Sequence, residues 1–239
     1  MNNILIPSMG KSLFFKDSFF PKPMIEIEGK TMLEQVVENY FRLEDKHFVF
    51  VFDKKDCAEF HLDDSARILT GNDTDIVILG AQTAGALCTC LMAIQSINNN
   101  EPLIITNCDQ TIDVDYNDVL KHFSENDVDA GVITFDSIHP RWSYGRKDGN
   151  YIVEVAEKRP ISRNAIAGFY YYRKGSDFIK AAQNAIMKKN STDGRYYISA
   201  SMNEIILMGK KIGYYDIEKE QYKSFYSPAK IKEYEDSLR

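Results

Sequence analysis

The stretch Asn3-Ile-Leu-Ile-Pro-Ser-Met-Gly10 is a short apolar run that leads directly into a glycine-containing loop. Strands that are buried on both faces read as nearly continuous apolar runs, as in parallel sheets. Similar runs follow at His47–Phe52, Asp75–Leu79 and Pro102–Thr106, and an amphipathic segment at Thr31–Tyr40 predicts a helix between the first two. Because strands that alternate with helices build βαβ units, the sequence predicts a parallel sheet covered on both faces.

The pattern becomes more mixed after Asp115. Further helices are predicted over 84–96, 116–124, 177–187, 198–208 and from residue 229, and further strands over 130–135, 151–155, 165–172 and 212–217. A linker of low complexity is not evident in the sequence, so a single domain over 1–239 is expected. The predicted fold class is α/β: a Rossmann-like nucleotide-binding (GT-A-like) domain with a mainly parallel mixed central sheet and helices on both faces.

Composition excludes several classes of function. The chain has 29 Lys and Arg against 35 Asp and Glu, a net charge of −6, which argues against broad binding of nucleic acid or of an anionic membrane surface. The sequence shows neither an apolar run long enough to span a membrane nor a secretory signal pattern. The four cysteines form no CxxC pair, so reduced thiols and a cytoplasmic location are expected.

Ligands of open α/β sheets bind where strands end at their carboxyl edge. The segments to consider are therefore Ser8–Lys22, Gly80–Gly85 and Asn107–Asp113, together with the loops near Tyr144 and Lys158. Taken in order, these segments resemble the sugar-phosphate nucleotidylyltransferases, also called pyrophosphorylases. The resemblance spans about 200 residues and rests on five segments: Ile4–Glu34 with its Pro-Lys-Pro-Met run, Gly80–Ala86, Ile105–Asp109, Tyr144-Gly145 with Val155–Pro160, and Ala165–Tyr171.

For the nucleotide, the resemblance assigns Lys22 to the α-phosphate and the transition state, and Asp109 to Mg²⁺. Gln82, Thr83 and Gly85 resemble the loop that reads the base. Nucleotide contacts are also expected from four further residues: Pro7, Gly10, Lys11 and Asn107. The two prolines beside Lys22 restrict the backbone and would present its ammonium from a stiff segment. The nucleotide-binding half is expected to be 1–115.

For the acceptor, the resemblance implies a half formed by 116–239. Lys158 is expected to contact the acceptor phosphate, with Tyr144, Gly145, Glu157, Gly168 and Tyr170 around the acceptor. The stretch Ile138–Gly145 is most similar to a branch that serves capsule and surface-polysaccharide biosynthesis. The implied partners are an NTP and a phosphorylated sugar or polyol, with release of pyrophosphate. A homodimer is the commonest assembly for such a chain.

Two positions depart from the family pattern. Phe14 stands where the family has an arginine that grips the leaving phosphates, with Ser12 in place of a loop glycine. Phenylalanine supplies neither a charge nor a hydrogen bond to a phosphate. Ser224 stands where a second metal-binding Asp is usual, and Asp216 is the nearest acidic candidate. The resemblance therefore implies the fold more firmly than full catalytic competence.

Two other functions remain open. A glycosyltransferase that uses a nucleotide-diphosphate sugar could have the same fold, although Asp109-Gln-Thr-Ile-Asp113 lacks an Asp-x-Asp motif. A non-catalytic binder of nucleotide or sugar phosphate would account for Phe14 and Ser224. A nucleotidylyltransferase releases pyrophosphate, whereas a glycosyltransferase releases a free nucleoside diphosphate, so the released product distinguishes the main interpretation from the first alternative. Nucleotide binding without turnover would identify the second alternative.

Overall fold

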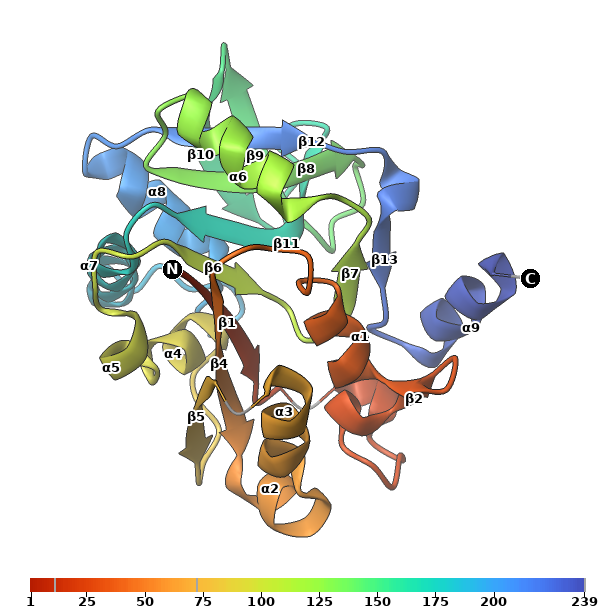
Figure 1. The fold of residues 1–239 in the computed structure, drawn as a ribbon. Helices are drawn as coiled ribbons and strands as arrows, with labels where there is room; N and C mark the ends of the chain where they lie inside the picture. Colours follow the sequence, from red (N-terminus) through yellow and green to blue (C-terminus); the bar gives the residue numbers. More distant parts are fainter. Residues whose placement is uncertain (11, 72, 239) are drawn as a thin grey trace.

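The computed structural model describes residues 1–10, 12–71 and 73–238 (Figure 1). Its central sheet begins with four parallel strands in the order β6-β1-β4-β5. Their bounds are β1 Asn2–Ser8, β4 Lys46–Asp53, β5 Thr74–Leu79 and β6 Leu103–Thr106. All four follow the predicted apolar runs, so the predicted parallel sheet of the first half is confirmed.

The sheet continues into the second half through antiparallel strands. Strand β11 pairs with β6, β8 and β9 in antiparallel fashion, and β12 then adds to β8 in parallel. The bounds are β8 Ala130–Asp136, β9 Ser143–Asp148, β10 Tyr151–Glu157, β11 Asn164–Tyr172 and β12 Ile212–Asp216. Within the described residues, one nine-stranded sheet therefore takes strands from both halves of the chain. The mixed, mostly parallel sheet is the predicted one.

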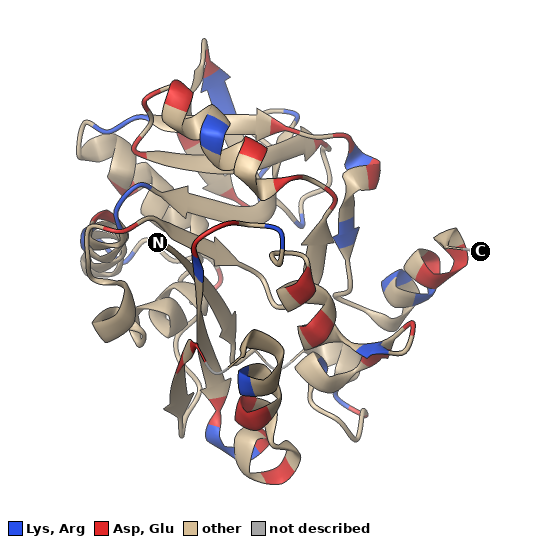
Figure 2. Cartoon of the chain, in the orientation of Figure 1, with Lys and Arg blue, Asp and Glu red and all other residues tan. Residues whose placement is uncertain are grey.

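Helices cover both faces of this sheet, and alternate residues of each strand enter different cores. In β4, Phe48, Phe50 and Phe52 pack on one face, whereas Val49 and Val51 pack on the other. The first core is covered by α1 Met32–Glu38, α2 Lys54–Phe60, α3 Leu62–Thr70 and α6 Tyr116–Glu125. The second is covered by α4 Ala86–Leu91, α5 Ile94–Ile97, α7 Gly175–Met187 and α8 Ser199–Leu207. Figure 2 shows the charged residues mainly on helices and loops.

Several elements differ from the sequence predictions. The helix expected over 84–96 is broken at Met92 and Ala93 into α4 and α5. Helices α2 and α3 were not predicted; they meet at His61, which adopts the left-handed conformation with φ 54°. Strand β9 was also missed. The remaining short elements are β2 Glu26–Ile27, β3 Lys30–Thr31 and the 3₁₀ turns η1 Leu13–Phe15, η2 Lys22–Met24 and η3 Lys219–Gln221.

The C-terminal segment returns to the middle of the molecule. Strand β13 (Tyr222–Ser224) pairs with β7 (Gln110–Ile112), the short strand that follows the carboxyl end of β6. Helix α9 (Pro228–Ser237) then extends from the body of the protein (Figure 1) and packs through Ile231 on Phe225 and Met32. This pairing places Ser224 beside the loop that carries Asp109.

Two expectations about chemistry can be compared with the fold. The four cysteines are free thiols, and Cys57, Cys90 and Cys108 are buried while Cys88 is half-buried. Among the helices of the described ranges, none has the length and apolar character that crossing a bilayer requires.

Candidate functional site

The pair formed by Lys22 and Asp109 is the centre of the site. Lys22 begins the 3₁₀ turn η2, with extended Pro21 before it and buried Pro23 after it. Asp109 lies just beyond the carboxyl end of β6. The Lys22 Nζ donates to Asp109 Oδ2 at 2.9 Å, and the two side chains are 14% and 19% exposed. Lys22, which the sequence predicts to act on the α-phosphate, and Asp109, which it predicts to bind Mg²⁺, are therefore in direct contact.

The surroundings of Lys22 keep it positively charged. Burial alone would lower its pKa, but the adjacent Asp109 carboxylate and the Cys108 thiol outweigh this effect, so the pKa lies above its ordinary value. A lysine of this kind is a fixed positive charge rather than a general base. Its natural role beside a phosphate is electrostatic stabilisation.

A hydrogen-bonded frame fixes the loop around Asp109. Asn107 donates to the Gln110 side chain at 2.9 Å, and Gln110 donates to the Ala167 carbonyl at 2.6 Å. Gly168 adopts φ 64°, and a Cβ there would collide with both the Asn107 and the Gln110 side chains. The predicted nucleotide residue Asn107 and the predicted acceptor residue Gly168 thus belong to one packed unit beneath Asp109.

The predicted base-reading loop lies between β5 and α4. Gln82 is exposed and donates to Asp53 at 3.2 Å, whereas Thr83 bonds to Thr89 at 2.6 Å and to the Gly85 carbonyl. Gly85 has φ 134°, and any Cβ there would collide with the backbone of Tyr196. Tyr196 also donates its amide to the Ala84 carbonyl at 2.9 Å. A segment of the second half therefore shapes this loop.

The predicted nucleotide residue Pro7 lies within β1, and the first loop leaves this strand after Ser8 and reaches an exposed Gly10. Lys11, the predicted nucleotide contact, lies outside the described residues. Phe14 projects into solvent with 61% of its side chain exposed, and its ring meets the Tyr226 ring edge-on at 5.5 Å. Position 14 therefore offers an aromatic surface where the family pattern has a cation.

The predicted acceptor residues Glu157 and Lys158 lie at the end of β10. Glu157 accepts hydrogen bonds from Ser143 at 2.5 Å and Ser199 at 2.7 Å. Lys158 has φ 53° and donates to the Tyr197 hydroxyl at 2.6 Å. That hydrogen bond is the largest influence on the pKa of Lys158 and raises it; burial lowers the pKa by less, and the charges of Tyr197, Asp193 and Glu157 raise it further. Strained backbone at a charged residue is typical of functional positions.

The three other predicted acceptor residues are largely internal. Tyr170 is 5% exposed with its hydroxyl 3.5 Å from Ser143, and burial raises its pKa. Tyr144 is fully buried in the first core and donates its hydroxyl to the His139 carbonyl at 2.6 Å. The Gly145 carbonyl accepts from Ser162 and Asn164. A direct ligand contact by the Tyr144 side chain therefore has no support in this geometry, and the acceptor role of this group stays a prediction.

The two predicted metal residues are not brought together. Asp216 ends β12, where it accepts from Lys147 at 2.6 Å and from Thr134 at 2.6 Å. These partners belong to β9 and β8 rather than to the loop around Asp109. The residue of the C-terminal segment that lies near Asp109 is instead Ser224. Ser224 pairs with Gln110, and the amide of the next residue, Phe225, donates to the Asp109 carbonyl at 2.8 Å. Among the described residues, no cluster of three or more metal-ligating side chains is present.

Sequence reasoning missed the residues that meet the site through tertiary contacts. Tyr197 holds Lys158, and Tyr222 donates to Gln110 at 3.0 Å. Arg141 places its guanidinium 4.3 Å from the centre of the Tyr226 ring, the ring that touches Phe14. The stretch Ile138–Gly145 stands out in the sequence only for its resemblance to a branch of the family, and nothing in that stretch predicts that Arg141 lies over the Tyr226 ring.

Comparison with known proteins identifies the family and the fold of the chain. The profile of the family described as Nucleotidyl transferase matches residues 18–219. The nucleoside-diphosphate-sugar pyrophosphorylase from Vibrio cholerae RC9 is 23% identical, with a TM-score of 0.84 over 98% of this chain and 99% of that one. No curated protein sequence matches the chain significantly.

Two further solved structures share the fold at lower identity. A Bacillus anthracis protein provisionally assigned as a glucose-1-phosphate thymidylyltransferase is 16% identical, with a TM-score of 0.78 over 100% of this chain and 96% of that one. HddC from Yersinia pseudotuberculosis is 15% identical, with a TM-score of 0.72 and full coverage of both chains, 100% each. At these identities the likeness concerns the fold.

Proposed function

The chain belongs to the nucleotidyl transferase family, and we propose that it transfers a nucleoside monophosphate from an NTP to a phosphorylated sugar or polyol, releasing pyrophosphate. The observation that carries this proposal is the contact between Lys22 and Asp109 at the carboxyl end of β6. It joins a fixed cation to a carboxylate at the edge of the sheet where ligands of such folds bind. The similar folds of a nucleoside-diphosphate-sugar pyrophosphorylase and of a protein provisionally assigned as a glucose-1-phosphate thymidylyltransferase support the same class of substrates.

The reaction needs charge neutralisation more than proton transfer. An acceptor phosphate oxygen attacks the α-phosphorus of the NTP, a new P–O bond forms, and the bond to the β-phosphate oxygen breaks to release pyrophosphate. Both partners are polyanions, so the main tasks are to position them and to stabilise the developing charge. Lys22 would neutralise the reacting phosphate, and Lys158 would bind the acceptor phosphate.

The residues around Asp109 fit a magnesium ion. Mg²⁺ is commonly held by one or two carboxylates together with substrate phosphates, so a single partly exposed carboxylate is sufficient protein support. Asp109 would supply that ligand, with the Ser224 hydroxyl on the neighbouring strand as a neutral companion. Bound Mg²⁺ would neutralise charge on the triphosphate and help to align it.

A panel experiment tests the proposal. The protein is incubated with each common NTP, Mg²⁺ and a set of sugar 1-phosphates and polyol phosphates, and inorganic pyrophosphate is measured with the nucleotide product. One NTP and acceptor pair should release pyrophosphate in equal amount to a nucleoside-diphosphate-linked product. Release of a free nucleoside diphosphate would instead indicate a glycosyltransferase. Binding of an NTP without turnover for any pair would support the non-catalytic alternative.

The place of the reaction can be proposed more finely. The stretch Ile138–Gly145 resembles the branch that makes precursors of capsule and surface polysaccharide, which would place the reaction in the cytoplasm, where NTPs are available. The product would then be the activated donor for a transferase that adds a sugar or polyol phosphate to a growing polymer. Deleting the gene should reduce a phosphate-containing surface polymer, and an unchanged polymer composition would contradict this role.

Lys158 gives a prediction that separates the two substrates. Replacing Lys158 with methionine removes the charge but keeps most of the side-chain length, so KM for the acceptor should rise about 10- to 100-fold. KM for the NTP should change less than about threefold, because the nucleotide is held by the other half. Steady-state kinetics with each substrate varied in turn measure both values. Arg159→Met, at an exposed neighbour, is the matched control. Equal changes for the two substrates would contradict the assignment.

A further inference from the structure

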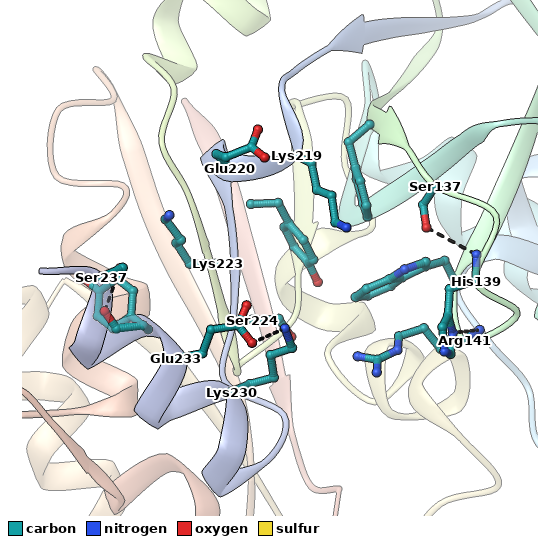
Figure 3. Close-up of a pocket in the computed structure, with 14 residues that line it drawn as sticks. Ser137, His139, Arg141, Lys219, Glu220, Lys223, Ser224, Lys230, Glu233 and Ser237 are labelled. Atoms are coloured by element: carbon teal, nitrogen blue, oxygen red, sulfur yellow. Dashed lines mark hydrogen bonds and ion pairs between the residues drawn. The ribbon is translucent and has the colours of Figure 1, made fainter.

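A cavity of 460 Å³ lies between the loop 137–142 and the C-terminal segment 219–237 (Figure 3). One wall is aromatic: the Phe135 and Tyr222 rings stack at 5.1 Å, and Trp142 meets both edge-on at 5.5 and 5.3 Å. The other lining side chains include four cations and two carboxylates: Arg141, Lys219, Lys223, Lys230, Glu220 and Glu233. The cavity therefore has an excess of positive charge, in contrast to the chain as a whole, whose net charge is −6.

Three of these cations, Arg141, Lys219 and Lys223, form no ion pair within the part of the chain that the structure describes. Lys230 forms an ion pair with Glu233. Arg141, in contrast, forms no ion pair with a described residue, and its guanidinium lies over the rings of Tyr226 and Trp142, 4.3 and 5.3 Å from their centres. Lys219 likewise has no ion-pair partner among the described side chains. The guanidinium is stacked on the rings, and none of its five N–H donors bonds to a residue that the structure describes.

The cavity is linked to the loop of Asp109 through the pairing of β13 with β7. Ser224 lines the cavity and pairs with Gln110, the residue after Asp109. Tyr226, which carries the Arg141 guanidinium, touches Phe14 in the first loop. The cavity lining is therefore connected to the Asp109 loop through Ser224, and to Phe14 of the first loop through Arg141 and Tyr226.

We propose that this cavity is a binding site for a phosphate-bearing anion, with Arg141 as the principal donor and Lys219 as a second charge. A planar guanidinium matches two phosphate oxygens, whereas a lysine provides a point charge. The aromatic wall of Trp142 and Tyr222 would cover an apolar face of the ligand. The inference depends on the proposed function in one respect, the source of the anion. This source is either the NTP polyphosphate or a separate phosphorylated molecule.

Direct titration with inorganic pyrophosphate and with orthophosphate tests the site without any turnover. Arg141→Met should weaken pyrophosphate binding about 10-fold, and Lys219→Met, at an exposed position, about threefold. Arg141→Lys should lie between Arg141→Met and the wild type because it keeps the charge and loses the fork. Lys232→Met is the matched control: Lys232 is exposed on the same helix as Lys230 but does not line the cavity, so binding should stay within about twofold. Thermal melts identify any variant that fails to fold, and Lys219→Met then carries the test.

Competition distinguishes the two sources. If a saturating non-hydrolysable NTP blocks the Arg141-dependent binding of pyrophosphate, the anion is the nucleotide's own polyphosphate. If pyrophosphate binds equally well with the NTP present, the site takes a separate phosphorylated ligand. The proposal fails if Arg141→Met and Lys219→Met bind pyrophosphate as tightly as Lys232→Met, or if neither anion binds the wild type. Failure of the proposed function would appear instead as an absence of pyrophosphate release in the substrate panel.

Discussion

Replacing Lys22 with methionine is expected to lower turnover about a thousandfold or more, which corresponds to about 4 kcal/mol of transition-state stabilisation. Lys22 is the cation in direct contact with Asp109, and methionine keeps the apolar stem while removing the charge. Because catalysis of phosphoryl transfer depends on positioned charge, the loss should fall mainly on kcat. NTP affinity, measured by titration, should fall far less, since the other proposed contacts to the phosphates and the base would remain.

If Lys22→Met loses turnover, a measurement of stability shows whether the cause is a destabilised fold or the missing positive charge. The substitution leaves the Asp109 carboxylate, which is only 19% exposed, without its partner, which should cost about 1 to 3 kcal/mol in unfolding free energy. Chemical denaturation measures this cost directly. Lys30→Met removes another paired lysine, the partner of Glu38 at 2.6 Å, and should leave turnover within about twofold. Turnover of Lys22→Met within tenfold of the wild type would contradict the assigned role.

The sheet was predictable because each of its parallel strands is recognisable from its own short stretch of apolar sequence. Apolar runs such as Asn3–Pro7 and His47–Phe52 must be buried on both faces, and the structure places them at the centre. Helices α2 and α3 were missed because Lys54–Thr70 is largely polar. They are supported by caps such as Asp53 on the Lys55 amide and by burial of a few residues, including Cys57 and Leu62.

The site was predictable where a residue's position follows from its own strand or turn. The contact between Lys22 and Asp109 follows from motif order, since each lies at the carboxyl edge of the sheet. The neighbours of that pair depend on pairing between distant segments. Strand β13 meets β7 across more than a hundred residues, as the Tyr222–Gln110 hydrogen bond shows. Neither three-residue strand carries a local signal, so Tyr226 and Arg141 could be placed only from the fold, whereas the resemblance had already put Ser224 at a position near the metal.

The last prediction concerns the frame beneath Asp109. Gly168→Ala is expected to destabilise the protein by about 3 kcal/mol and to lower kcat at least about 100-fold. The new Cβ would collide with Asn107 and Gln110, whose mutual hydrogen bond and bond to Ala167 fix the Asp109 loop. These side chains are packed, so the loop must shift to relieve the contact. Denaturant unfolding and steady-state kinetics at saturating substrates measure the two effects.

Gly209→Ala separates backbone strain from this collision. Gly209 has φ 75°, close to the φ 64° of Gly168, but a Cβ there meets no atom within 4 Å. Its substitution should therefore show only the cost of a left-handed alanine, about 1 kcal/mol, with activity unchanged. The excess loss in Gly168→Ala then measures the contact with the Asp109 frame. If both variants lose the same stability and both keep full turnover, the frame does not position Asp109, and the link from β11 to the reacting centre is wrong.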